Sequence, residues 1–209
     1  MTKIIAEIGW NHMGDMNLAK KMISAAAKSG ADYVKFQVWS EKNLKPGPWD
    51  KDGRREIYKK AELSKNQFET LKKFSRKMNI KITTSIFNIK DFYKIKDCNF
   101  SIIKIPSHEI YNLNLIKFCE KKFKTLLISA GAAKWSEILK IKKIKNFKKK
   151  IFLLHCVSAY PCLEEKINLN KIDQLKKITK NIGYSGHYSG IEDAIFAMTK
   201  GSIYIEKHF

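Results

Sequence analysis

NIGYSGHYSGIEDAIFAMTKGSIYIEKHF, residues 181–209, contains two short apolar runs separated by a segment of helical length. Each run leads to a histidine, His187 or His208, at the position where a β-strand is expected to end. Counting by twos along the second run places Tyr204, Glu206 and His208 on one face. Two imidazoles from neighbouring strand ends suit a divalent metal ion and leave positions open for water or substrate. The stretch therefore predicts a strand–helix–strand unit with a candidate metal site at its carboxyl end.

The same alternation runs through the whole chain. Apolar, β-branched runs lie at 4–8, 32–38, 80–87, 100–105, 125–130, 151–157, 182–184 and 202–206. Amphipathic segments of helical length lie between most of them, at 18–28, from 64 to 77, from 112 onward, and at 135–146, 168–179 and 191–199. Eight strand–helix units predict an α/β fold, a closed (β/α)8 TIM barrel. The alternative is an open doubly wound sheet, but no GxGxxG follows the first strand.

Local signals mark several helix ends and turns. Gly30 follows the first amphipathic segment as a C-terminal cap. Residues 64–67, Ser-Lys-Asn-Gln, form a capping box, and Asn112 is a candidate N-cap. The turn after the first strand contains His12 and Gly14; we expect His12 to be a turn residue and Gly14 to adopt a positive φ.

Composition limits the class of protein. The chain has 209 residues, a mass of 24.3 kDa and 44% hydrophobic residues, enough for one domain with a sizeable core. No apolar run approaches the ~20 residues of a membrane helix, and the N-terminus lacks the features of a signal peptide. We expect a cytoplasmic protein without a membrane segment. Its four cysteines include no CxxC pair, which favours reduced structural thiols.

The net charge of +21 raises the question of a nucleic-acid partner. The lysines, however, are spread along predicted helix faces and turns, as at 140–145, and are not interleaved with aromatic residues on one strip. This pattern favours a solvated lysine-rich surface, so nucleic-acid binding is disfavoured. A positive field still favours an anionic substrate. The unusually long segment 39–63, with Trp39, Trp49, Arg54 and Tyr58, is long enough to be a functional loop.

Polar side chains stand at almost every predicted strand end, where the active site of such a barrel lies. They are Glu7, Lys35, Gln37, Thr84, Ser85, Lys104, Ser107, Glu109, Ser129, His155, Ser158, Ser185, His187, Glu206 and His208. We expect them to form one charged pocket. Lys35 and Gln37 share a strand face, and Lys104 is expected to point inward as well. The two lysines with Ser85, Ser107, Ser129 and Ser185 suit a phosphate and a carboxylate.

These residues belong to motifs that resemble the sialic acid synthase family, the N-acetylneuraminate synthases with their legionaminic and pseudaminic acid relatives. The motifs are AEIGWNHMGD at 6–15, GADYVKFQ at 30–37, YKKAELS at 58–64, IKIPSHE at 103–109, LLISAGA at 126–132, LLHCVSAYP at 153–161, IGYSGH at 182–187 and IEKHF at 205–209. The resemblance covers the whole chain but only the barrel part of the family's longer architecture.

The resemblance implies a metal-dependent condensation of phosphoenolpyruvate with an N-acetylated amino-sugar aldehyde, typically N-acetylmannosamine, to give a nonulosonic acid and phosphate. It assigns a divalent ion, Mn²⁺ or Mg²⁺, to His187 and His208, although paired imidazoles by themselves suit zinc equally. Residues that match positions gripping phosphoenolpyruvate are Lys35, Lys104, Ser107, Ser129 and Ser185. Residues that match positions facing water, sugar or metal-bound groups are Glu7, Gln37, Glu109 and Tyr160. Ser85 and Ser158 complete the expected substrate contacts.

The chain departs from the family pattern at three positions. A frequent Thr-Pro-Phe turn is replaced by Ser85, Ile86 and Phe87; a frequent Gly is His108; and several bacterial members have Asp where Gly186 stands. The eighth helix and the C-terminal antifreeze-like domain of the family are missing, so we expect a barrel truncated after its eighth strand. We expect that chain to be aggregation-prone or partner-dependent, with negligible activity alone, and the full-length form to be a homodimer.

Two other functions stay open on the sequence. One is a Schiff-base aldolase with Lys35 or Lys104 as nucleophile. The other is an inactive barrel fragment or a basic binding module. Borohydride trapping with pyruvate identifies the first, and a salt-sensitive shift of nucleic acid identifies the second.

Overall fold

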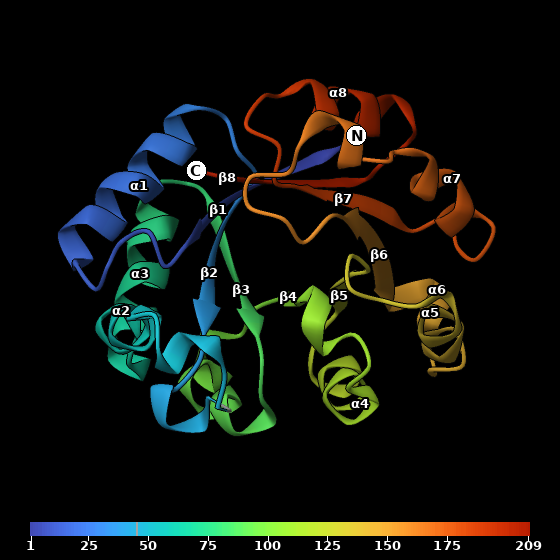
Figure 1. Cartoon of the computed structure of the whole chain (residues 1–209). Coiled ribbons are helices and arrows are strands. Elements are labelled where there is room, and N and C mark those ends of the chain that lie inside the picture. Colours follow the sequence, from blue (N-terminus) through green and yellow to red (C-terminus); the bar gives the residue numbers. More distant parts are fainter. Residues whose placement is uncertain (45) are drawn as a thin grey trace.

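The computed structural model describes residues 1–44 and 46–209, and its strands close into a parallel barrel in chain order. The strands are β1 (Lys3–Gly9), β2 (Tyr33–Val38), β3 (Lys81–Ile86), β4 (Ile102–Ile105), β5 (Thr125–Ser129), β6 (Ile151–Cys156), β7 (Ile182–Gly186) and β8 (Tyr204–His208). Figure 1 shows the helices arranged around the outside of this barrel. The predicted (β/α)8 TIM-barrel fold is confirmed.

The α-helices are α1 (Met16–Lys28), α2 (Arg54–Ala61), α3 (Lys65–Lys77), α4 (Leu113–Lys122), α5 (Trp135–Ile141), α6 (Phe147–Lys150), α7 (Asn170–Lys176) and α8 (Glu192–Thr199). Short 3₁₀ turns are η1 (Glu41–Asn43), η2 (Pro48–Asp50), η3 (Ile89–Lys94), η4 (Lys96–Cys98), η5 (Ser107–Glu109) and η6 (Glu164–Lys166).

The local signals act as predicted. Ser64 and Gln67 form a reciprocal capping box at the start of α3, and the Asn112 side chain accepts from the Leu115 backbone N–H at the start of α4. Gly30, just after α1, has φ +80°, and Gly14 has φ +81°. A β-carbon at Gly14 would collide with the backbone carbonyl of residue 60, so this tight turn requires glycine.

Two predicted segments differ in detail. The segment 39–63 is not a bare loop, because it contains η1, η2 and the two-turn helix α2; Lys45 within it lies outside the described residues. The single helix expected at 135–146 ends at Ile141, and α6 begins after Asn146, whose φ of 60° is left-handed. A left-handed residue cannot continue an α-helix, so the chain turns there.

The barrel interior is divided into an apolar floor and a polar layer. Ile5, Tyr33, Ile102, Leu127 and Leu154 form a buried cluster, against which Phe152 and Tyr204 pack. Because side chains two residues apart share a strand face, the next inward residues are Glu7, Lys35, Lys104, Ser129, Cys156 and Glu206. The strands thus carry the polar groups to the carboxyl end of the barrel.

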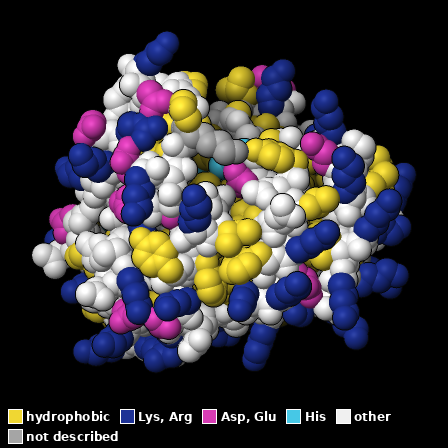
Figure 2. All heavy atoms as spheres, turned by 90° about the horizontal axis from the view of Figure 1, so that it is seen from below, with side chains coloured by type: hydrophobic (Ala, Val, Ile, Leu, Met, Phe, Trp, Pro, Cys, Tyr) yellow, Lys and Arg dark blue, Asp and Glu magenta, His cyan; other side chains and the backbone are white. Residues whose placement is uncertain are grey.

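Figure 2 shows one face of the molecule, over which the Lys and Arg side chains are spread rather than gathered into one patch. In the described part of the chain, no helix is both long and apolar enough to cross a membrane. All four cysteines are buried.

Candidate active site

A cavity of about 700 Å³ opens at the carboxyl ends of the strands. The expected site residues that line it are Glu7, Lys35, Gln37, Ser85, Lys104, Ser107, Ser129, Ser158, Tyr160, Ser185, His187 and His208. Residues as far apart as Glu7 and His208 meet there because β8 pairs with β1, with these two residues directly opposite each other. Barrel closure therefore brings the two ends of the chain into one site.

Glu109, which the sequence placed in the site, does not line the cavity. It lies at the end of η5, and its carboxylate accepts a hydrogen bond from the Asn112 side chain at 2.8 Å. Successive residues of a 3₁₀ turn point in directions about 120° apart, so Ser107 faces the cavity while Glu109 does not. Its position does not support the direct contact with substrate that the sequence led us to expect.

His155, at the end of β6, also lies outside the cavity. Its Nε2 bonds the carbonyl oxygen of Ile167 at 2.7 Å, on the outer side of the strand. Its neighbours Leu154 and Cys156 occupy the inward positions, and strand alternation turns His155 away from them.

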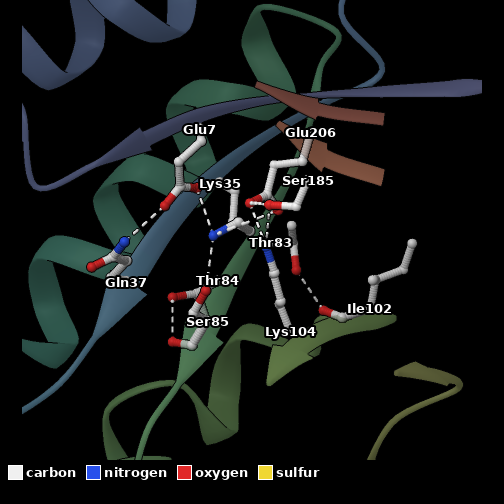
Figure 3. A network of polar contacts seen from close by, with 10 residues as sticks. All are labelled: Glu7, Lys35, Gln37, Thr83, Thr84, Ser85, Ile102, Lys104, Ser185 and Glu206. Carbon is white, nitrogen blue, oxygen red and sulfur yellow. Dashed lines mark hydrogen bonds and ion pairs between the residues drawn. The ribbon is translucent and has the colours of Figure 1, made fainter. Parts of the chain in front are cut away.

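The base of the cavity holds Lys35 between two carboxylates (Figure 3). Its ammonium nitrogen lies 2.6 Å from Glu7 Oε2 and 3.7 Å from Glu206 Oε2, and it donates to Ser85 Oγ at 2.8 Å. Gln37 Nε2 donates to the other oxygen of Glu7 at 2.9 Å. Glu7 and Lys35 are each only 1% exposed, so their ion pair is largely shielded from solvent.

Lys104 makes the second set of contacts. Its ammonium donates to Ser185 Oγ at 2.9 Å and to Glu206 Oε1, and the Ser185 hydroxyl donates to the same Glu206 oxygen at 3.0 Å. Two buried lysines and two buried carboxylates thus form one charge-balanced network. Removal of any one of the four side chains would leave a buried charge without full compensation.

The two carboxylates differ in their acidity. Burial raises the pKa of Glu7, although the Lys35 charge partly opposes this effect. Burial also disfavours the charged form of Glu206, but the charges of Lys104 and Lys35 outweigh it and lower the pKa of Glu206 to about 2. Glu7 is therefore the carboxylate that more readily takes up and releases a proton, whereas Glu206 stays negatively charged.

Glu206 is a central residue of the site, although the sequence pattern predicted for it only a place at a strand end. The signal was present, because counting by twos puts it on the face of His208. Its partners, however, come from β2, β4 and β7, and only the strand register brings them together.

Ser129 offers an unpaired hydroxyl at the base of the cavity. The residue is 2% exposed, and its Oγ has no hydrogen-bond partner among the described residues. Buried polar atoms are nearly always paired, so this hydroxyl is a candidate contact for a ligand. Ser107, which follows the neighbouring strand β4, does have a partner: its Oγ lies 2.9 Å from Cys156 Sγ.

His187 and His208 face each other at the cavity wall, with ring centroids 5.6 Å apart. His187 Nδ1 lies 2.6 Å from the Val157 carbonyl oxygen, which only accepts, so Nδ1 carries the proton and Nε2 presents its lone pair. Desolvation lowers the pKa of both imidazoles, which keeps them unprotonated. The Tyr160 ring packs against that of His187, tilted by 38°, with centroids 4.0 Å apart.

These two donors fit a divalent ion. Neutral imidazole is a common metal ligand, and a backbone carbonyl that fixes the tautomer is a typical supporting contact. Among residues 1–44 and 46–209, no three His, Cys, Asp or Glu side chains form a metal-binding cluster. The protein side of the site is thus a pair, and water or substrate would have to supply the remaining ligands.

The segment 39–63 reaches the cavity, which Trp39, Trp49, Arg54 and Tyr58 all line. Trp10 and Asn11, which follow β1, line it too and were not anticipated. The unusual residue His108 lies at the rim, where its ring stacks on that of Phe87 with centroids 5.4 Å apart.

The third unusual position, Gly186, is explained by its surroundings. The Asp193 carboxylate accepts from the Tyr184 hydroxyl at 2.8 Å and from the Lys207 ammonium at 3.0 Å. A β-carbon at Gly186 would collide with that carboxylate and would lie 2.7 Å from the Tyr184 ring. The buried Asp193 occupies the space that a side chain at position 186 would need.

Comparison with solved structures supports this fold at high similarity. The N-acetylneuraminic acid synthetase of Leptospira borgpetersenii, solved with citrate, superposes with a TM-score of 0.90 at 36% identity, covering all of this chain and 73% of that one. A truncated 3-deoxy-D-arabino-heptulosonate 7-phosphate synthase of Thermotoga maritima gives a TM-score of 0.73 at 15% identity, which shows a shared fold alone.

Curated proteins give the same relationship in sequence. The chain is 37% identical to the N,N'-diacetyllegionaminic acid synthase of Campylobacter jejuni, covering 100% of this chain and 67% of that protein. It is 35% identical to the pseudaminic acid synthase of Helicobacter pylori and 30% identical to the human N-acetylneuraminate-9-phosphate synthase, covering 65% and 61% of their lengths. The chain thus spans roughly two thirds of these relatives. The model of the NeuB family matches residues 22–209, and the chain therefore belongs to the NeuB family.

Proposed function

We propose that this chain forms the barrel of a synthase that condenses phosphoenolpyruvate with an N-acetylated amino-sugar aldehyde, giving a sialic-acid-type nonulosonic acid and phosphate. The observation that carries the proposal is the convergence of Lys35 and Lys104, both buried, at the base of a cavity whose wall holds the His187–His208 pair. Family membership supports it, because the relatives are named as synthases of legionaminic, pseudaminic and neuraminic acids.

In this proposal the buried lysines bind the phosphate and carboxylate of phosphoenolpyruvate. Charge-assisted hydrogen bonds from ammonium groups are among the stronger contacts that a protein makes to such anions. Ser85 and Ser129 add hydroxyl groups that can donate to the ligand, while Ser185, whose hydroxyl donates to Glu206, helps to hold Lys104 in place. Lys35 and Lys104 already contact Glu7 and Glu206. When the ligand binds, at least one N–H of each ammonium must therefore donate to the ligand.

His187 and His208 would hold the divalent ion, Mn²⁺ or Mg²⁺, through their unprotonated ring nitrogens. When bound, such an ion supplies a Lewis acid that polarises the aldehyde oxygen. Tyr160 packs against both imidazoles, with centroids 4.0 and 5.6 Å away, and so restrains the orientation of the pair.

The new carbon–carbon bond forms between C3 of phosphoenolpyruvate and the aldehyde carbon, while the C=O π bond opens and the aldehyde oxygen takes up a proton to become a hydroxyl. The cation that develops at C2 is captured by water, and phosphate leaves with cleavage of its C–O bond. Glu7 takes the proton of that water, because its raised pKa makes it the stronger base of the two buried carboxylates. Gln37 orients it by donating to Oε1. Glu206 stays ionised and balances the developing positive charge.

The proposal is tested with phosphoenolpyruvate labelled with ¹⁸O in the bridging position, incubated with an N-acetylated amino-sugar and Mn²⁺. Because the chain spans only about two thirds of its relatives and is expected to have negligible activity alone, it is assayed fused to the C-terminal third of a relative. We expect sugar-dependent release of phosphate that carries the label. Label retained in the organic product means P–O cleavage and contradicts the mechanism. A borohydride-trapped adduct with pyruvate contradicts the function itself, because it identifies an imine-forming aldolase.

A further inference from the structure

A buried pair of charged residues outside the cavity contacts the segment 39–63, here called the cavity segment. Asp91 and Lys94 belong to η3, the 3₁₀ turn that follows β3, and their exposed fractions are 1% and 3%. Residues three apart in a 3₁₀ helix lie on the same side of it, so η3 presents both charges toward one neighbour. Neither residue is among those that line the cavity. Charged side chains are seldom buried without partners, and both of these have partners in the cavity segment.

Both charges hold the start of the cavity segment. The Asp91 carboxylate oxygen Oδ1 accepts hydrogen bonds from Ser40 Oγ at 2.7 Å and from Asn43 Nδ2 at 2.8 Å. The Lys94 ammonium donates to the Trp39 carbonyl oxygen at 2.6 Å. Ser40 and Trp39 are both buried. The chain is therefore fixed to η3 directly after it leaves β2.

The same lysine holds the end of the cavity segment. The Lys94 ammonium also donates to Glu62 Oε1 at 2.6 Å, and Glu62 Oε2 accepts from the Glu41 backbone N–H at 2.6 Å. Lys94 thus joins residues 39 and 62, and Glu62 joins back to residue 41. Replacing the ammonium by an apolar group would leave a main-chain carbonyl and a carboxylate without this donor. The two ends of the segment would then lose the contact that they share.

The cavity segment forms part of the cavity lining. Its lining residues are Trp39, Leu44, Trp49, Arg54 and Tyr58. Trp39 Nε1 donates to the Tyr58 carbonyl oxygen at 3.1 Å, so a displacement of residue 39 is transmitted to α2. Lys35 and Lys104 stand instead on β2 and β4, where the barrel fixes them independently of η3. Loss of the η3 contacts should therefore disturb the side of the cavity and leave its base intact.

We propose that Lys94 is a positioning residue for the reaction, because it fixes the cavity segment against the barrel without contacting substrate. Phosphoenolpyruvate, bound at the base, does not need the segment, whereas the second substrate needs a complete cavity wall to be held against it. A displacement of about 1 Å caused far from the reacting atoms can lower a rate roughly 100-fold. The kinetic part of this inference rests on the proposed function, and the structural part does not.

Trypsin measures whether the cavity segment is held, because the segment contains several cleavage sites, among them Lys42 and Lys51. Lys94→Met removes the ammonium and keeps an unbranched side chain. We expect it to speed cleavage within residues 42–60 about 10-fold or more, since local opening no longer has to break the ammonium contacts. Mass spectrometry locates the cuts. Lys90→Met is the matched control, because Lys90 is exposed on the same turn, and its cleavage rate should match that of the parent.

Calorimetry and turnover show whether the held segment serves the reaction. In Lys94→Met the Kd of phosphoenolpyruvate should stay within about 2-fold of the parent value, because distant sites that share no partner act independently. Turnover is measured on the chain fused to the C-terminal third of a relative, with Mn²⁺ present. There the KM of the amino-sugar should rise, and kcat/KM should fall about 10-fold or more. A purely structural defect would not separate the two substrates in this way.

Glu62→Gln tests the bridge with a smaller change. The amide oxygen can accept from only one of the two donors at a time, so cleavage of the segment should speed up about 3-fold. In the double variant, Glu62→Gln should add nothing to Lys94→Met, because the shared contact is already lost. The Glu62 side chain is 29% exposed, so this variant should fold even if Lys94→Met does not. Additive effects would mean that the two residues act separately and would overturn the bridge.

Cleavage in Lys94→Met that matches the parent, or that speeds up equally in Lys90→Met or throughout the chain, would overturn the inference. Faster cleavage of the segment with unchanged kcat/KM would overturn the positioning role. A parent chain that neither binds phosphoenolpyruvate nor turns over counts against the proposed function, while trypsin still decides whether Lys94 holds the segment.

Discussion

Glu7 and Lys35 lie directly opposite each other on β1 and β2, and the Lys35 ammonium is 2.6 Å from Glu7 Oε2 inside the barrel. A buried ion pair contributes little net stability, because the cost of desolvating two charges offsets their attraction. At the base of a cavity, such a pair instead holds the Lys35 ammonium in a position to bind an anionic ligand.

Lys35→Ala and Lys104→Ala should each weaken phosphoenolpyruvate binding, since each removes a charge-assisted contact of about 1.5–3 kcal/mol, or about 10- to 150-fold in Kd. Calorimetry measures the change. Lys3→Ala is the control, because Lys3 pairs with Asp32 at the opposite end of β1. Melting temperatures should be recorded too, because each variant leaves a carboxylate without its partner. Unchanged affinity in both variants, with the fold intact, would show that the anion binds elsewhere.

Glu7→Gln should spare phosphoenolpyruvate binding and lower kcat. The amide has the same shape and can still bond Gln37, but it cannot take a proton from water. Loss of general-base catalysis typically costs about 10²–10⁴ in rate. Binding by calorimetry and turnover by phosphate release distinguish the two effects. A variant that retains full kcat would mean that another group accepts the proton.

His187→Ala and His208→Ala should each weaken Mn²⁺ binding by more than about 100-fold, the upper range for losing even a supporting contact of a metal ligand. One remaining imidazole is a poor metal site, and among the described residues no third His, Cys, Asp or Glu side chain completes a cluster with the pair. His155→Gln is the control, since His155 bonds the Ile167 carbonyl outside the cavity. Calorimetric affinities that match the parent in both alanine variants would exclude the pair as the metal site.

Gly186→Ala should destabilise the protein by about 1–3 kcal/mol, because the new methyl group overpacks the space held by Asp193 and Tyr184. Urea unfolding measures the effect. At Gly30 the space is open and φ is +80°, so Gly30→Asn should change the free energy of unfolding by no more than ~0.5 kcal/mol. Equal effects at the two positions would argue against the packing explanation.

The buried thiols give a pH-dependent prediction. Burial raises the pKa of Cys98 to about 11 and that of Cys119 to about 12, from the value of 9.0 for an exposed thiol. The folded thiols thus keep their protons where the unfolded chain begins to release them, so the free energy of unfolding should fall as pH rises above about 9. Iodoacetamide at about pH 8 should modify these two cysteines slowly in the native chain and rapidly in urea. Rapid native labelling, located by mass spectrometry, would contradict their burial.

The sequence predicted the fold because its hydrophobic period and its helix-capping residues indicate the same strands and helices along most of the chain. The apolar runs gave the eight strands, Ser64 and Asn112 marked helix starts, and strand alternation identified Lys35 and Lys104 as inward-facing. Such signals depend on neighbours along the chain, and one sequence contains them in full.

Relations between distant segments become visible only in the folded barrel. The register of β8 against β7 and β1 makes Glu206 a partner of Lys104 and Ser185 and brings His208 beside His187. The η5 turn directs Glu109 away from the cavity toward Asn112, and Asp193 fills the space beside Gly186. Side-chain direction at a turn and space between packed strands are set by barrel closure, which fixes distances that no local pattern encodes.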